Sequence, residues 1–236
     1  YQDADGTTTG LLVVESDFSS RLYHQCLDHP PAIRVQPPPR YDDLRCAQWA
    51  PRAIEEPLTV LWAGQPETAS CLRTLRFLLP VLEGEGVRLL FRAHPRDHGY
   101  HAVEYSALFQ EYSLPWTDVT MQEINQVFSN AVALVLTQFS SLGIQAGFRG
   151  IPALNVLLPD AGGELLYQLK GYTVPAPCIA GAAFVISSEE QADVVATSLR
   201  DIDARRGVMA NFAALYDPYH PQTPSLVKAL QGIMAP

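Results

Sequence analysis

Basic residues are scarce in this sequence. Among its 236 residues, 16 are Lys or Arg and 25 are Asp or Glu, which gives a formal net charge of -9. The basic residues are scattered along the chain and form no stripe of the kind that follows a DNA duplex or an RNA strand. We therefore expect no nucleic-acid partner, and any site that binds an anion must be local.

Cysteines and long apolar runs are also few. The cysteines lie far apart and form no C-x-x-C pair, at Cys26, Cys46, Cys71 and Cys178. This spacing argues against a disulfide framework and against a structural zinc site. No apolar run approaches the roughly 18 to 20 residues needed to cross a bilayer, and no signal peptide opens the chain. We expect a cytoplasmic protein with reduced thiols and no integral membrane segment.

Three common catalytic motifs are missing. The sequence has no G-x-x-x-x-G-K-S/T loop, no G-x-G-x-x-G fingerprint and no G-x-S-x-G elbow. These absences argue against a P-loop nucleotidase, an ordinary NAD dehydrogenase and a serine hydrolase. His94, His98 and His101 are close enough in sequence to suggest zinc, but Pro95 and Gly99 interrupt the helix that would align the first two. We expect no metal, with zinc as the weaker alternative.

Regular alternation of apolar runs and helical patterns begins at residue 58. Apolar residues make up 47% of the sequence, which is enough for a full core. We predict strands at residues 58–63, 88–93, 114–119, 133–137, 151–156 and 183–186. We predict helices at residues 69–82, 102–112, 121–130, 141–148, 162–169, 187–199, 207–215 and 223–234. Strands that alternate with helices predict parallel pairing, and hence a three-layer α/β domain with a Rossmann-like parallel sheet.

The first 57 residues follow a different pattern. We predict a strand, a helix and a second strand there, at residues 11–14, 17–27 and 33–35. Five of the 19 prolines fall within residues 29–39, which fits neither a helix nor a central strand. We interpret residues 36–57 as a linker. The predicted division is an N-terminal segment with a Pro-rich linker, residues 1–57, as a short remnant of a second unit, and a main domain, residues 58–236.

The main domain is organised around residues 133–156, a strand, a tight turn, a helix and another strand. The turn carries Ser140 and Ser141 where the free N–H groups of the new helix point outward. Such a turn is a natural anion site. The alternative is that Ser140 merely caps the helix.

Ligands of parallel sheets bind beyond the carboxyl ends of the strands. Three loops at predicted strand ends suit an anion, at residues 64–66, 94–97 and 138–141. Gly64 lets the backbone approach a bound group, and Gln65 follows it just before a helix N-terminus that favours negative charge. Arg92, His94 and Arg96 gather donors at the second loop. Each loop alone also fits an ordinary turn, but together they predict a small phosphate site.

The order of these motifs carries a family resemblance. The motifs are Leu61 to Pro66, Phe91 to Pro95, Phe139 to Ser141 and Gly150 to Pro152. This series resembles the C-terminal, nucleotide-sugar-binding half of a GT-B glycosyltransferase, over about residues 58–200. The His-Pro pair, followed 46 residues later by the Ser-Ser pair, is most similar to bacterial sialyltransferases and polysialyltransferases, and less closely to CDP-glycerol glycerophosphotransferases.

The resemblance implies roles for these residues. The His of the His-Pro motif contacts the nucleotide phosphate and can act as general acid, which would fall to His94. The serine pair binds the same phosphate, which would fall to Ser140 and Ser141. Preorganised donors at the leaving phosphate oxygen would stabilise the transition state, and the family chemistry needs no metal cofactor. The partners implied are a cytidine or uridine nucleotide sugar and a glycan acceptor.

Two positions depart from the family pattern. The family's base lies in an acidic-Gly motif of the other domain, for which Asp5 is the candidate, but Asp5 precedes His94 by only 89 residues. Gln145 stands where related sequences often carry an acidic residue that holds ribose hydroxyls. We expect either a missing N-terminal domain, a homo-oligomer, or a reduced relative that binds a nucleotide without transfer. In the last case Asp5 lies in a solvated loop.

Three functions remain open at this point. The first is a glycosyltransferase of surface polysaccharide or glycan assembly. The second is a non-catalytic nucleotide-binding or interaction module with the same fold. The third is an enzyme similar to the UDP-N-acetylglucosamine 2-epimerases, which share the fold and would need acidic groups near the sugar.

Overall fold

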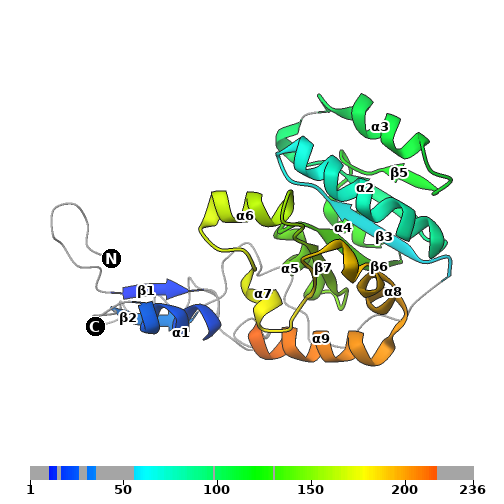
Figure 1. Ribbon diagram of the computed structural model, residues 1–236. Helices are drawn as coiled ribbons and strands as arrows, with labels where there is room; N and C mark the ends of the chain where they lie inside the picture. Colours follow the sequence, from blue (N-terminus) through cyan, green and yellow to red (C-terminus); the bar gives the residue numbers. More distant parts are fainter. Residues whose placement is uncertain are drawn as a thin grey trace.

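The larger unit of the structure is a parallel β-sheet. The computed structural model describes residues 11–14, 17–26, 31–35, 56–97, 99–129 and 131–216. Within these residues a six-stranded sheet has the order β5-β4-β3-β6-β7-β8, with every neighbouring pair parallel (Figure 1). Its strands are β3 (Thr59–Ala63), β4 (Arg88–Arg92), β5 (Trp116–Asp118), β6 (Val132–Thr137), β7 (Ala153–Val156) and β8 (Phe184–Ile186). The predicted Rossmann-like α/β fold is confirmed, and each predicted strand of this sheet has its counterpart.

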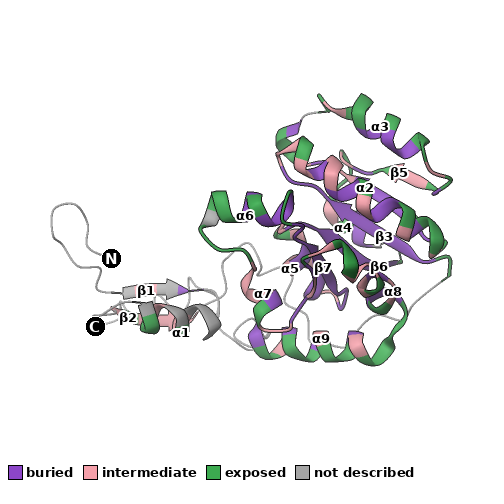
Figure 2. Ribbon diagram, viewed as in Figure 1, coloured by how far each residue is buried: buried purple, intermediate pink, exposed green. Residues whose placement is uncertain are grey.

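Helices cover both faces of the sheet because strand side chains alternate between the faces. Val60 and Trp62 belong to one core cluster and Leu61 and Ala63 to another. The first cluster includes residues of α2, α3 and α8, and the second includes residues of α4 and α5. Every residue of β3 and β6 is buried, as expected for central strands covered on both sides (Figure 2). The helices are α2 (Thr68–Gly84), α3 (Ala102–Gln110), α4 (Ile124–Ser129), α5 (Leu142–Gly147), α6 (Gly162–Lys170), α7 (Ala176–Ile179), α8 (Asp193–Arg200) and α9 (Ile202–Leu215).

The N-terminal part forms a small unit of its own. Strands β1 (Leu11–Val14) and β2 (Ala32–Val35) pair in parallel, and helix α1 (Asp17–Cys26) connects them. The three elements confirm those predicted for the N-terminal segment. Most of the predicted linker and the predicted helix at residues 223–234 lie outside the described residues, and the domain boundary at residue 57 remains a prediction.

Three predicted helices differ from the observed ones. The helix predicted from residue 121 begins at Ile124, because the Thr120 hydroxyl accepts a hydrogen bond from the Ala93 amide instead of capping a helix at residue 121. The last described helix begins at Ile202 rather than Gly207, because the Asp201 carboxylate caps it by accepting hydrogen bonds from two main-chain amides. The helix predicted at residues 187–199 is split into a 3-10 turn at Glu189–Gln191 and α8.

Helix α7 was missed by the sequence analysis. It is a single turn, and Pro177 lies at one of its first two positions, where a missing N–H costs no hydrogen bond. Proline in that position is the signal that could have located it.

The strand order places a topological switch point at the centre of the sheet. From β3 the chain continues to β4 and β5 on one side, and then returns to add β6, β7 and β8 on the other. The connections on the two sides of β3 and β6 therefore diverge, and ligands of such sheets bind beyond the carboxyl ends of these strands.

Candidate functional site

The loops after β4, β3 and β6 lie side by side at the carboxyl edge of the sheet. These three strands are adjacent and parallel, so their ends meet at one rim. The structure thereby brings the 64–66, 94–97 and 138–141 loops to the same edge, although residues 64 and 141 are far apart in sequence. Asp5 lies outside the described residues, and so does His98.

Gly64 connects the loop after β3 to the end of β4 through a main-chain hydrogen bond. Its amide donates a hydrogen bond of 2.9 Å to the Arg92 carbonyl oxygen. A Cβ atom at this position would lie 3.3 Å from that oxygen and 3.4 Å from the His94 amide nitrogen. A side chain here would press on the backbone of the neighbouring loop, which would have to move slightly. Gly64 thereby helps to fix the position of the His94 backbone.

The His94 side chain offers its Nε2 atom as a donor. The Arg96 amide donates a hydrogen bond of 3.1 Å to Nδ1, so in the neutral ring the proton resides on Nε2. Partial burial lowers the pKa of His94 below its ordinary value, and the nearby charge of Arg96 lowers it further. Glu67 and Asp97 oppose this shift in pKa. At neutral pH the ring is therefore mainly uncharged and donates through Nε2.

The two arginines of this loop differ in what they contact. The Arg92 Nη1 atom donates to the carbonyl oxygens of Val119 and Gln122, at 2.9 Å and 2.6 Å. Its guanidinium therefore holds the loop between β5 and α4. Arg96 is exposed on the 3-10 turn at Pro95–Asp97. Of the two, Arg96 has the side chain placed to meet a ligand from solvent.

The serine pair begins α5 at the end of β6. The Ser140 amide donates to the Thr137 hydroxyl at 3.0 Å, and the Ser140 hydroxyl accepts a hydrogen bond of 3.3 Å from the Leu142 amide. The hydroxyl therefore stabilises the helix start and keeps its own proton to donate. Ser141 is exposed. Gln145 lies in α5, but it lines neither of the two cavities described below.

Buried polar atoms without partners gather at the same edge. Gln65 is only 7% exposed, and its Nε2 atom has no hydrogen-bond partner among the residues that the structure describes. The same holds for Trp62 Nε1, Glu67 Oε2 and Gln138 Oε1. All four residues lie at or just beyond the ends of β3 and β6. Buried groups of this kind are rare in folded proteins and mark this rim as unusual.

The Cys71 side chain of α2 contacts the main chain of Gln65. Its sulfur accepts a hydrogen bond from the Gln65 amide at 3.2 Å, and its thiol faces the Gln65 carbonyl oxygen at 3.5 Å. Burial raises the pKa of the Cys71 thiol to about 11, so the thiol stays protonated at neutral pH. Cys71 thus has a structural role beside the site.

Gln138 is a residue that the sequence analysis missed. It is fully buried, and its Nε2 atom donates to the Ser70 carbonyl oxygen, the Ser70 hydroxyl and the Thr74 hydroxyl. Asn155 donates to the Gln138 carbonyl oxygen at 2.8 Å. These bonds fix the serine loop against α2 and β7. A glutamine directly after an apolar strand was the available signal.

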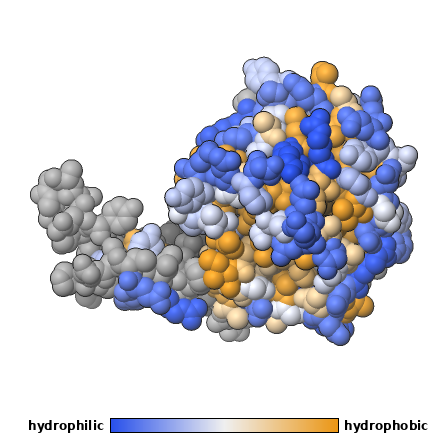
Figure 3. Space-filling view, viewed as in Figure 1, coloured by the Kyte–Doolittle hydropathy of each residue, from blue (hydrophilic) through white to orange (hydrophobic). Residues whose placement is uncertain are grey.

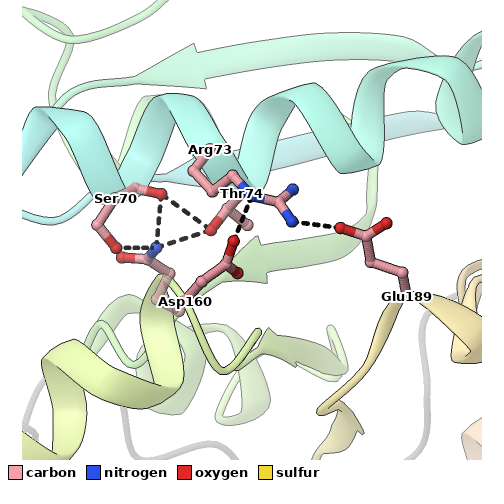
Figure 4. A network of polar contacts seen from close by, with 6 residues as sticks. Ser70, Arg73, Thr74, Asp160 and Glu189 are labelled. Atoms are coloured by element: carbon pink, nitrogen blue, oxygen red, sulfur yellow. Dashed lines mark hydrogen bonds and ion pairs between the residues drawn. The ribbon is translucent and has the colours of Figure 1, made fainter.

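An ion-pair cluster continues this network on the surface. Arg73 of α2 pairs with Asp160, which follows β7, and with Glu189, which follows β8 (Figure 4). The Arg73 Nε atom lies 2.8 Å from the Asp160 carboxylate. The cluster links α2 to the loops after β7 and β8.

Two cavities lie near the serine and histidine loops. The β4–β5 cavity, of about 500 Å³, is bounded by the loops after β4 and β5. Its lining includes Ala93, Pro95, Asp97, Thr120 and Met121. The α5–α9 cavity, of about 220 Å³, is bounded by α5, β7, α7 and α9.

Among the described residues, no three His, Cys, Asp or Glu side chains are grouped so that they could hold a metal ion. No helix in the described part of the chain is both long enough and apolar enough to cross a membrane.

Comparison with known proteins identifies the fold. No protein-family model matches the sequence, and no curated protein matches it. The structure is similar to the pneumococcal O-GlcNAc transferase GtfA in complex with UDP and GlcNAc, with a TM-score of 0.55 and 14% identity over 98% of this chain and 46% of GtfA. Sucrose-phosphate synthase from Thermosynechococcus elongatus gives a TM-score of 0.54 and 17% identity, over 98% of this chain and 60% of that one. The wall teichoic acid polymerase TagF gives a TM-score of 0.52 and 14% identity, over 95% of this chain and 56% of TagF.

These similarities show the fold and no more. The sheet with its flanking helices is a Rossmann-like α/β structure that matches GT-B glycosyltransferases. The chain spans between 46% and 60% of the length of these three proteins.

Proposed function

We propose that this chain is the nucleotide-sugar-binding part of a GT-B glycosyltransferase. The observation that supports the proposal is that the loops with Gly64, His94 and the serine pair follow three adjacent parallel strands at the switch point of the sheet. Ligands bind at that place in open parallel sheets, and these residues supply donors for an anion there. The similarity of the fold to GtfA, TagF and sucrose-phosphate synthase agrees with it.

The donor's leaving phosphate would lie between His94 and the serine pair. Cleavage of a sugar from a nucleoside phosphate places negative charge on the leaving oxygen, and fixed N–H and O–H donors stabilise that charge in the transition state. In the free protein His94 is mainly neutral and donates through Nε2. A bound phosphate would raise the pKa of His94, because a negative charge favours the imidazolium form. Phosphate binding would thus convert His94 from a neutral donor toward a general acid.

The nucleobase would lie in the β4–β5 cavity. Ala93 and Pro95, the two neighbours of His94 in the chain, line this cavity, and most of its surface is apolar. Its polar groups include the side chains of Arg92, Asp97, Asp118 and Glu123. A pocket that is mainly apolar with a few polar groups suits a planar base. We propose a cytidine or uridine nucleotide, because the motif order resembles sialyltransferases and CDP-glycerol glycerophosphotransferases. The proposed pathway is surface polysaccharide or glycan assembly, on the cytoplasmic side.

Catalysis would require a carboxylate that faces His94 across a cleft. Asp5, the candidate from the sequence, lies outside the described residues. The chain spans about half the length of the proteins it resembles, so a further domain or a second chain could also supply this base. The proposal for the whole enzyme therefore includes an acceptor-binding partner domain.

A non-catalytic nucleotide-binding module is the second candidate. It is favoured by the lowered pKa of His94, which suits a hydrogen-bond donor more than an acid, and by the neutral Gln145. The two candidates differ in donor hydrolysis, because an enzyme should hydrolyse its donor slowly without acceptor and a module should not. A 2-epimerase would need acidic groups near the sugar, and it stays the third alternative.

The proposal is tested by thermal unfolding with CMP, CDP, UMP and UDP. A nucleotide that binds only the folded protein raises its melting temperature. At least one of the four should raise it for the unaltered protein, and His94→Ala should abolish that increase. His101→Ala is the matched control, because this nearby imidazole pairs with Glu104 on the surface and should leave the increase unchanged. If none of the four nucleotides raises the melting temperature, the proposal is wrong.

A further inference from the structure

Glu67 has a buried carboxylate oxygen that is available as an acceptor. Its Oε2 atom has no hydrogen-bond partner among the residues that the structure describes. Glu67 is also the N-cap residue of α2, but its side chain makes no capping hydrogen bond. By contrast, Asp160 and Glu189 beside the same helix both pair with Arg73, and hydrophilic residues gather over α2 (Figure 3). A buried carboxylate oxygen without a donor is costly, so it calls for a partner that forms in another state of the site.

The loop that carries Glu67 lies against the loop that carries His94. The Gly64 amide donates to the Arg92 carbonyl oxygen, and a Cβ atom on Gly64 would lie 3.4 Å from the His94 amide nitrogen. The charge of Glu67 reaches the imidazole across this contact. Burial and Arg96 lower the pKa of His94, and Glu67 opposes them by raising it.

Protonation of His94 requires a new acceptor at Nδ1. In the free protein Nδ1 accepts a hydrogen bond of 3.1 Å from the Arg96 amide, which only the neutral ring can do. In the imidazolium form both ring nitrogens carry protons, so Nδ1–H and the Arg96 N–H would face each other as two donors. Among the described carboxylates, Glu67 and Asp97 raise the pKa of this ring. The Asp97 Oδ1 atom already accepts from the His101 amide at 3.1 Å, which leaves Glu67 Oε2 as the better acceptor.

We propose that Glu67 accepts the Nδ1 proton of His94 in the imidazolium form, which a bound nucleotide phosphate stabilises. Glu67 is then a positioning residue, because it acts on the donor phosphate through His94 and holds Nε2–H toward that phosphate. The inference rests on the proposed function, in which His94 is the general acid.

The protons balance over one reaction. When the phosphate binds, the His94 ring takes up one proton from solvent at Nδ1. When the bond between the sugar and the leaving phosphate oxygen breaks, its electron pair stays on that oxygen, which takes the Nε2 proton. The ring is then neutral with its proton on Nδ1, where Glu67 still accepts it.

An NMR titration of the free protein tests the contact. At low pH the unaltered protein should show the Nδ1 proton of His94 as a far-downfield ¹H signal, because an imidazolium proton donated to a carboxylate forms a strong, charge-assisted hydrogen bond. Glu67→Met removes the acceptor, and should abolish this signal and lower the pKa of His94 by about one unit. A signal and a pKa that both persist in Glu67→Met would overturn the proposal.

Glu104→Met is the matched control for this titration. It removes a carboxylate that faces another imidazole, because Glu104 lies 3.4 Å from His101 on the surface, and it should leave His94 unchanged. If the melting temperature of Glu67→Met falls strongly, Glu67→Gln takes its place. The glutamine keeps the shape of the side chain without its charge, so the pKa of His94 should again fall.

Nucleotide affinity at different pH values tests the link to the ligand. The affinity of the unaltered protein, divided by that of Glu67→Met, should increase by about tenfold between about pH 8 and about pH 5.5, a range set by the ordinary pKa of histidine of about 6.5. A purely structural role of Glu67 would change the affinity equally at every pH. A constant ratio would therefore overturn the proposal.

The two experiments together separate this proposal from the proposed function. A nucleotide that binds with a constant ratio leaves the proposed function standing and removes the role of Glu67. If no nucleotide binds at any pH, the proposed function is wrong, and the NMR titration of the free protein still decides whether Glu67 accepts the Nδ1 proton.

Discussion

The Gly64 amide donates a hydrogen bond of 2.9 Å to the Arg92 carbonyl oxygen, two residues before His94. This contact joins the ends of two adjacent strands, so the imidazole is held by the backbone of the neighbouring loop. The site therefore depends on main-chain packing as much as on its side chains.

Gly64→Ala should weaken nucleotide binding. The added Cβ would lie 3.3 Å from the Arg92 oxygen and 3.4 Å from the His94 nitrogen, so the two loops must separate slightly. We expect a loss of about 1 kcal/mol in stability and about tenfold in nucleotide affinity. Urea unfolding and titration measure the two effects.

Gly207→Ala is the control for this prediction. Gly207 lies within α9, and no atom of the described residues lies within 4 Å of its Cβ position, so alanine should stabilise the helix by about 0.5 to 1 kcal/mol. Nucleotide affinity should stay unchanged. Equal affinities of the two variants for the nucleotide would contradict the role given to Gly64.

Nucleotide affinity should depend on pH through His94. The pKa of His94 is lowered in the free protein, and a bound phosphate would raise it. The bound state therefore takes up protons between these two pKa values, so affinity should rise as pH falls through this interval and level off below the lower value.

His94→Asn isolates this effect from the ionisation of the phosphate itself. The nucleotide affinity of the unaltered protein, divided by that of the His94→Asn variant, should increase as pH falls. The total increase should be about tenfold for each unit by which the bound phosphate raises the pKa of His94. Titration between pH 5.5 and 8, a range that follows from the ordinary pKa of histidine of about 6.5, measures it. A ratio that is constant with pH would show that His94 does not meet the phosphate.

The buried amide network should matter more than the surface ion pairs. Gln138→Met leaves the Ser70 and Thr74 oxygens without their shared donor, and should cost about 1 to 3 kcal/mol. Arg73→Ala should cost about 1 kcal/mol or less, because Asp160 and Glu189 are each more than half exposed. Urea unfolding at low and high salt compares them, and a larger cost for Arg73→Ala would contradict this ranking.

Substitutions at Gly147 and Phe212 should have coupled effects on the stability of the protein. A Cβ at Gly147 would lie 2.2 Å from the Phe212 ring, so Gly147→Ala should destabilise the packing of α9 on α5 by about 1 to 3 kcal/mol. Phe212→Leu removes part of that clash. The double variant should therefore be more stable than the sum of the single effects predicts. Strictly additive effects would show that the two residues do not compete for this space.

The sequence predicted the elements of the fold because their signals are local. Apolar runs such as residues 133–137 and caps such as Gly150, which has a positive φ of 72°, are visible without knowledge of neighbours. The sequence could not predict the strand order, because pairing depends on contacts between distant residues.

The site was predicted less completely for the same reason. Gly64 and His94 were predicted as loop residues, but their contact through Arg92 depends on the register of β3 and β4. That Arg92 contacts phosphate stays a prediction, and the sequence did not reveal that its Nη1 atom donates to the carbonyl oxygens of Val119 and Gln122. The role of Gln138 depends on Ser70 and Thr74 of α2, more than 60 residues away, and no local pattern reveals such a contact.

The central claim is that the Nε2–H group of His94 meets the phosphate of a bound nucleotide. Long-range ¹H–¹⁵N NMR spectra of the imidazoles test it directly, with His94→Asn to assign the signal. We predict that the free protein shows His94 with its proton on Nε2, and that adding the nucleotide with the largest thermal shift moves this signal toward the imidazolium form. A nucleotide that binds while the His94 signal stays unchanged would contradict the account.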